Sequence, residues 1–189
     1  MSQLINQADQ KTLLKIARNA LENSVGGQVL SEINLNELSP TIQANGASFV
    51  TLTKNGKLRG CIGTLEAYQP LAEDVQEHAV AAAMQDPRFP IVQPQECRMI
   101  DIEVSILTPK VPLQYSGSQD LIDKIHPGID GVVLQNGFRK ATFLPQVWEK
   151  LPDPAEFLSH LCMKMGAPAG LWGKKPMQVF TYQVQEFHE

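Results

Sequence analysis

Apolar positions in residues 6–25 recur every three or four residues, which is the period of a helix with one buried face. Asn6 and Asp9 stand where side chains cap the start of a helix, and Gly26-Gly27 can end it. The pattern therefore predicts a helix over residues 6–25 that packs on the core.

The spacing then changes to that of strands. Residues 47–53 read as a strand, Asn55-Gly56 is a strong signal for a tight hairpin turn, and residues 57–65 form the return strand. Pro70 occupies the first position of a following helix. Residues 100–106 alternate isoleucine or valine with polar residues, as a half-buried strand does. The order is strand, strand, helix, strand.

The same order recurs in the second half of the chain. Residues 131–134 lead into Asn136-Gly137, and residues 138–144 return. Residues 153–166 begin with a capping box and end at a glycine, which predicts a helix. Phe, Tyr and Val alternate over residues 180–184 and predict a final strand.

The offsets between the two halves agree to within a few residues. Asn55 lies 81 residues before Asn136, and Pro70 lies 84 residues before Pro154. We interpret this as a duplicated ββαβ unit, so the predicted fold class is α+β with two subdomains and mostly antiparallel sheets. The chain is then a single domain, 1–189, with approximate lobes 45–108 and 130–187 and a connection between them.

Composition narrows the function classes. The chain has 189 residues, 43% hydrophobic and 19% charged, enough to bury a sizeable core. A net charge of −4 gives no basic footprint for nucleic acid or for an anionic membrane. The first twenty residues lack the apolar core of a signal peptide, and no run is long enough to span a bilayer. Three cysteines without CxxC spacing favour a reducing, cytoplasmic location over a disulfide framework.

The segment Leu58-Arg59-Gly60-Cys61-Ile62-Gly63 concentrates the candidate chemistry. In one interpretation Cys61 is a small buried residue and the two glycines serve packing. In a second, Arg59 and the backbone at Gly60 and Gly63 bind a ligand. In a third, Cys61 is a nucleophile or redox thiol whose thiolate Arg59 favours. Strand alternation predicts that Arg59 and Cys61 share one face. The residues leave these three interpretations open.

Two further segments carry candidate residues. Asp86-Pro87-Arg88-Phe89 ends a helix, and Arg88 either pairs locally with Asp86 or acts as a second anion donor beside Arg59. On the strand 100–106, the acids and Ser105 lie opposite the isoleucines. If that face is covered, Glu103 is a candidate general base or a partner of Arg59, and Ser105 a ligand contact. The histidines form no metal set, so the sequence predicts neither metal nor cofactor.

Four motifs in order resemble the AMMECR domain family, and in particular its members known as protein A of the AmmeMemoRadiSam system. The resemblance spans about Asn45 to Phe187. It implies an α+β fold with two subdomains and a system containing a Memo-like protein and a radical-SAM protein, without an established enzymatic activity. The motifs are Leu58–Gly63, Asp86-Pro87-Arg88-Phe89, Ile102–Pro109 and Phe143-Leu144-Pro145-Gln146-Val147.

Three functions follow as hypotheses. The leading one is a component that binds a small molecule or peptide for its partner enzymes, through a pocket between the lobes floored by Arg59–Gly63 and the acidic face of Asp101–Leu107. The second is an enzyme that uses Cys61 as a nucleophile or redox thiol. The third is a pure interaction scaffold in which the motif strand belongs to the core.

Overall fold

The amphipathic N-terminal segment forms helix α1 (Gln7–Val25), as predicted. The Asn6 side chain accepts a hydrogen bond from the Asp9 backbone N–H, and Gly27 has the positive φ, +68°, that commonly follows a helix. The computed structural model describes residues 4–189. None of the helices in this range is long and apolar enough to cross a bilayer.

The chain divides into two compact units. Unit 1 contains the chain up to Leu107 together with Gln185–Glu189, and unit 2 contains Thr108–Val184. The predicted first lobe, 45–108, ends within one residue of the junction at Leu107. The predicted second lobe, 130–187, differs more, because unit 2 begins at Thr108 and ends at Val184. The supposed connection belongs to unit 2, where it supplies a short strand and a helix, and the chain end belongs to unit 1.

The sheet of unit 1 is built on a hairpin of β1 (Asn45–Lys54) and β2 (Lys57–Gly63). Asn55 and Gly56 both have positive φ, 52° and 71°, which gives the turn that matches the twist of the strands. The strand order is β2-β1-β4-β9, and β3 pairs with the beginning of β1. The other strands are β3 (Gln69–Pro70), β4 (Ile100–Leu107) and β9 (Val184–His188).

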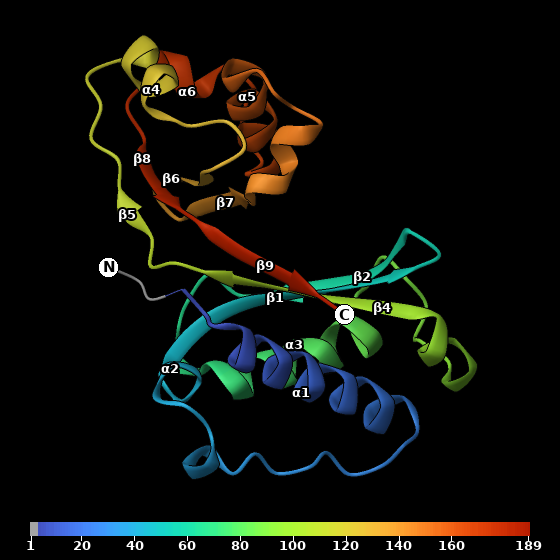
Figure 1. The fold of residues 1–189 in the computed structure, drawn as a ribbon. Coiled ribbons are helices and arrows are strands. Elements are labelled where there is room, and N and C mark those ends of the chain that lie inside the picture. The colour runs from blue at the N-terminus through green and yellow to red at the C-terminus, as the bar shows by residue number, and fades with distance from the viewer. Residues whose placement is uncertain (1–3) are drawn as a thin grey trace. The chain divides into compact units, whose positions relative to one another are not determined.

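Helices α1 and α3 (Leu71–Met84) lie on the same side of this sheet (Figure 1). Pro70 is the residue before the first turn of α3 rather than inside it. The core between sheet and helices contains the residues at the predicted apolar positions, and its fully buried members include Leu13, Leu21, Val50, Leu52, Val75 and Ile102. Short helical turns complete the unit: η1 (Leu35–Glu37), α2 (Pro40–Gln43) and η2 (Pro94–Met99).

Unit 2 has its own sheet and core. Its strand order is β5-β8-β6-β7, and β6 pairs antiparallel with both β7 and β8. The Asp153 side chain caps α5, as predicted, and the ring of Phe157 stacks on that of Trp148 in the core. The elements are β5 (Val111–Pro112), α4 (Ser118–Lys124), β6 (Gly131–Asn136), β7 (Arg139–Phe143), η3 (Pro145–Glu149), α5 (Pro154–Lys164), α6 (Leu171–Lys174) and β8 (Gln178–Tyr182).

The two units share one strand arrangement. In unit 1 the first hairpin strand β1 lies between β2 and β4, and in unit 2 the first hairpin strand β6 lies between β7 and β8. A helix, α3 or α5, lies between the second and third of these strands in each sequence. The predicted α+β class with antiparallel sheets and a repeated ββαβ order is therefore confirmed.

The predicted final strand is divided at Gln183. Residues before it form β8 in the sheet of unit 2, and residues after it form β9 in the sheet of unit 1. The Gln183 carbonyl accepts from the Thr108 backbone N–H at 2.9 Å, and its own N–H donates to the Thr108 hydroxyl at 2.9 Å. The alternation of residues 180–184 is real, but it extends over two strands with different partners.

Candidate functional site

The motif strand β2 contains an irregularity at Arg59. Leu52 pairs with Gly60 and Thr53 with Leu58, so Arg59 is the extra residue of a β-bulge. Strict alternation predicted that Arg59 shares a face with Cys61, and the bulge removes that alternation. The guanidinium of Arg59 instead lies with Lys54, whose position on β1 shares the face of the buried Leu52.

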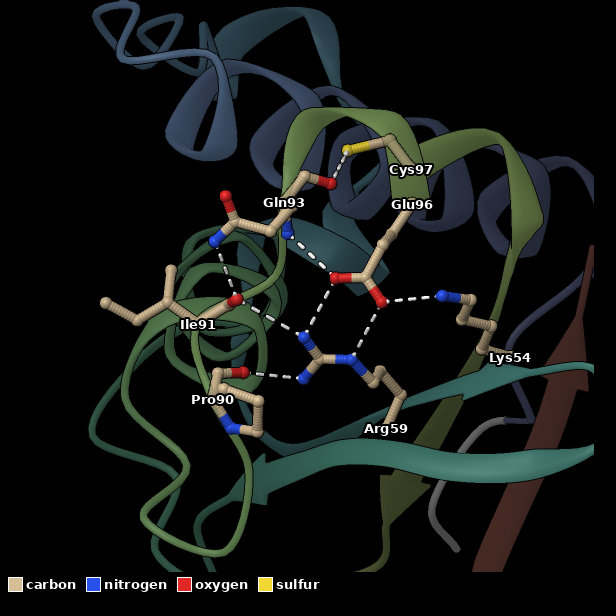
Figure 2. A network of polar contacts seen from close by, with 7 residues as sticks. All are labelled: Lys54, Arg59, Pro90, Ile91, Gln93, Glu96 and Cys97. Carbon is tan, nitrogen blue, oxygen red and sulfur yellow. Dashed lines mark hydrogen bonds and ion pairs between the residues drawn. The ribbon is translucent and has the colours of Figure 1, made fainter.

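Glu96 lies at the centre of the polar network that holds Arg59 (Figure 2). The Arg59 Nε and Nη2 atoms donate to its two carboxylate oxygens at 3.2 and 3.0 Å, and the Lys54 Nζ lies 2.8 Å from Oε1. Arg59 also donates to the carbonyl oxygens of Pro90 and Ile91, at 2.7 and 3.3 Å. The three nitrogens of Arg59 are thus engaged within unit 1.

This network is largely withdrawn from solvent. The side chains of Arg59 and Glu96 are 12% and 13% exposed. The hydrogen bond from Arg59, followed by that from Lys54, lowers the pKa of Glu96 to about 2. The geometry therefore gives Arg59 a structural role, which is to tie β2 to the 90–96 segment.

A second ion pair fixes the backbone of Cys61. Arg88 Nε and Nη2 donate to the two oxygens of Asp86 at 2.9 and 2.6 Å, which confirms the predicted local pair. Asp86 Oδ2 also accepts the Cys61 N–H at 2.9 Å, and Arg88 Nη2 donates to the Cys61 carbonyl at 3.0 Å. Arg88 holds the pKa of the Asp86 carboxyl well below its usual range, chiefly through its hydrogen bonds.

The position of β2 explains why Asp86 and Arg88 hydrogen-bond to the Cys61 backbone. β2 is an edge strand, so its outward N–H and C=O groups at Cys61 have no neighbouring strand to pair with. Asp86 and Arg88 satisfy both groups. Asp86 is almost fully buried, at 1% exposure, whereas the Arg88 side chain is 54% exposed. Because both backbone groups of Cys61 are occupied, an added strand cannot pair with β2 at this residue.

Both glycines of the motif are required by close packing. A Cβ on Gly60 would lie 2.1 Å from the Ala82 carbonyl oxygen of α3. A Cβ on Gly63 would lie 2.3 Å from the Phe49 ring and from the Ser48 carbonyl oxygen. These contacts favour the packing interpretation of Gly60 and Gly63 over close approach by a ligand.

The Cys61 thiol lies on the sheet face opposite α3. Thr51 pairs with Cys61 on one side and with Glu103 on the other, and its hydroxyl donates to the Cys61 sulfur at 3.3 Å. Cys61 and Glu103 are half-buried, whereas Ser105 is buried at 1% exposure. We call this surface the Cys61 face; it consists of Phe49, Thr51, Cys61, Glu103 and Ser105.

The structure thus separates the predicted site residues into two groups. Cys61, Glu103 and Ser105 share one face, but Glu103 is two strands away from the thiol, roughly 10 Å at the usual strand spacing. Arg59 belongs to the Glu96 network instead. Within residues 4–189, no three metal-ligating side chains cluster. The pocket predicted between the lobes stays a prediction.

Sequence reasoning missed Glu96, Lys54 and Thr51. Glu96 had a local signal, because it stands three residues after the N-cap residue Gln93, whose backbone N–H donates to it at 2.9 Å. Its pairing with Arg59, 37 positions earlier, had no local signal. Thr51 pairs with Cys61 only because of the bulge at Arg59, since counting back from the Asn55-Gly56 turn would place Thr51 opposite Gly60.

Comparison with known proteins agrees with this fold. The sequence profile of the AMMECR1 family matches residues 14–187. A Methanothermobacter thermautotrophicus protein is 39% identical over 186 residues, 98% of this chain and 96% of the relative. A Methanopyrus kandleri protein is 35% identical over 195 residues, 100% of this chain and 92% of the relative.

A solved structure matches as well. The crystal structure of an uncharacterized protein from Pyrococcus horikoshii superposes with a TM-score of 0.85 at 31% identity, and the match covers 94% of this chain and 90% of that one. Since the family profile matches most of the chain and the relatives are similar over nearly their whole length, this chain belongs to the AMMECR1 family.

Proposed function

We propose that this chain is a binding component that serves a Memo-like protein and a radical-SAM protein, and that the Cys61 face is its contact surface. The observation that supports this most is the fixed backbone of Cys61, bracketed by Asp86 and Arg88 at the edge of the sheet. A surface held in one geometry before binding loses little conformational entropy when a partner docks. The two partner types come from the family resemblance.

The surroundings of the thiol favour binding over nucleophilic catalysis. A nucleophilic cysteine usually has a general base within hydrogen-bonding reach. In the described part of the chain, the Cys61 sulfur has polar contacts with the Thr51 hydroxyl and with the guanidinium of Arg88, neither of which is a general base. Asp86 accepts the backbone N–H of Cys61 and is already paired with Arg88.

The hydrogen bonds at the edge of β2 argue against recognition of a partner as an added strand. A peptide that adds as a strand needs free N–H and C=O groups along the edge. At Cys61 both groups are occupied, so we expect recognition through the half-buried side chains of the Cys61 face, which excludes the buried Ser105, and through the half-exposed guanidinium of Arg88. Such a surface, aromatic and polar with few charges, is typical of a protein interface.

The proposal predicts that Glu103→Lys weakens partner binding by at least about tenfold, because it places a long cation on the Cys61 face, next to Thr51. The measurement is isothermal titration calorimetry with the Memo-like and radical-SAM proteins of the same organism. Glu37→Lys, on the exposed η1 turn of the same unit, makes the same charge change and should bind like the wild type. Equal affinity of the Glu103→Lys variant would overturn the placement of the interface.

A further inference from the structure

A groove runs along the side of α3 that faces away from the core. One wall is the outer surface of α3, and the other is the segment 30–33 that follows α1. The Gln76 side chain of the helix donates to the Ser31 carbonyl at 2.9 Å and joins the two walls. The groove has a volume of about 600 Å³, within the range of pockets that hold a small ligand or a few peptide side chains.

The lining of this groove combines aliphatic and acidic side chains. Leu30, Ile33 and Val80 provide aliphatic surface, and each is only half-buried. Three carboxylates, Glu32, Glu73 and Glu77, stand around them. The described residues of the lining include glutamines but neither lysine nor arginine. The groove is therefore negative, with an apolar component.

The carboxylate of Glu77 is held in place but not neutralised. The Gln69 amide donates to its Oε2 at 2.6 Å, and the Tyr68 hydroxyl donates to the same oxygen at 3.1 Å. Both donors are uncharged, so these two hydrogen bonds orient the oxygen without supplying a positive charge to pair with it. A cation that enters the groove would meet a preoriented acceptor.

Folding does not account for this set of acids. Glu73 is in the first turn of α3, where a negative charge stabilises the helix dipole. Glu77 is beyond that turn, and Glu32 is in a separate segment. The buried face of α3 is formed by other residues, including Leu71, Val75 and Ala79.

We propose that this groove binds a short segment of a partner protein that carries lysine or arginine side chains on either side of an apolar residue. The aliphatic residues of the groove receive the apolar side chain, and the carboxylates pair with the flanking cations. Glu73 and Glu77 are one helical turn apart, about 5–6 Å between their Cβ atoms, so two successive cations of the segment can be matched. This inference does not depend on the partners proposed for the Cys61 face.

The test uses a fluorescein-labelled peptide of about twelve residues, with lysines every fourth residue and leucines between them. Fluorescence anisotropy should give a Kd on the order of 10 µM, and Glu73→Gln with Glu77→Gln should weaken it at least about tenfold. The matched control is Glu37→Gln with Glu149→Gln, which removes the same charge from exposed positions outside the groove. A peptide with serine in place of leucine should also bind more weakly to the wild type, a result that does not depend on the folding of any variant.

Three results would overturn the proposal. The peptide could fail to bind at millimolar concentration, or the two double variants could bind it equally. Spermine could also displace the peptide as effectively as unlabelled peptide does, which would reduce the groove to a site for charge alone. Because no partner protein is present in these assays, their failure would leave the interface at the Cys61 face untouched.

Discussion

Replacing Gly60 by alanine is expected to lower the free energy of unfolding by about 3 kcal/mol, the largest effect of any single substitution considered for the motif. The added Cβ would lie 2.1 Å from the Ala82 carbonyl oxygen, a backbone atom that cannot rotate away as a side chain can. Either α3 moves away from β2 or the hairpin distorts. Urea unfolding followed by circular dichroism measures the loss.

Gly173→Ala is the matched control for this prediction. A Cβ on Gly173 meets no described heavy atom within 4 Å, and the residue lies in the short helix α6, where alanine is the better helix former. Its stability should stay level or rise slightly. If Gly60→Ala proved as stable as the wild type, the close contact between β2 and α3 would be wrong.

Replacing Glu96 by glutamine is expected to cost about 2 kcal/mol near neutral pH. Glutamine keeps the size of the side chain but leaves Arg59 and Lys54, two cations that share one carboxylate, without a counter-charge. Arg59 keeps its bonds to the Pro90 and Ile91 carbonyls, which limits the loss. Glu37→Gln, at an exposed site, serves as the control.

The stabilisation that Glu96 provides should decrease on acidification. The pKa of this carboxyl is about 2 in the folded chain, below its ordinary 4.5, so its contribution is complete above about pH 4.5 and is lost as the pH falls toward 2. The difference in free energy of unfolding between wild type and variant should therefore shrink on acidification. A difference that stays constant from neutral pH to about pH 2 would contradict the network in Figure 2.

The elements with local signals could be predicted from the sequence. Asn55-Gly56 forms the tip of the first hairpin, and the apolar period of residues 6–25 became α1. The tip of the second hairpin is Gly137-Phe138, one residue later than the predicted Asn136-Gly137, because Asn136 is the last residue of β6 and pairs with Arg139. The end of the last strand could not be predicted in this way. Residues 180–184 keep the same alternation on both sides of Gln183, and alternation shows which face a residue takes but not which sheet its strand joins.

The same limit applies to the site. The Asp86–Arg88 pair was predictable because its members are two residues apart. Their hydrogen bonds to the Cys61 backbone were not, because these depend on how the end of α3 packs against an edge strand. The bulge at Arg59 reversed the expected orientation of its side chain, and the hairpin turn alone does not reveal a bulge. Arg59 therefore looked like a donor to a ligand, because its partner Glu96 is distant in sequence and the ion pair has no local signal.

The most direct test of a partner interface at the Cys61 face is the alkylation rate of Cys61 itself. Cys61 is half-exposed, whereas Cys97 and Cys162 are buried at 7% and 0%, so mass spectrometry of iodoacetamide-treated protein can follow this one thiol. An excess of the Memo-like or the radical-SAM protein should slow the reaction by at least about tenfold, since a buried interface excludes the reagent. A rate that neither protein changes would contradict the account.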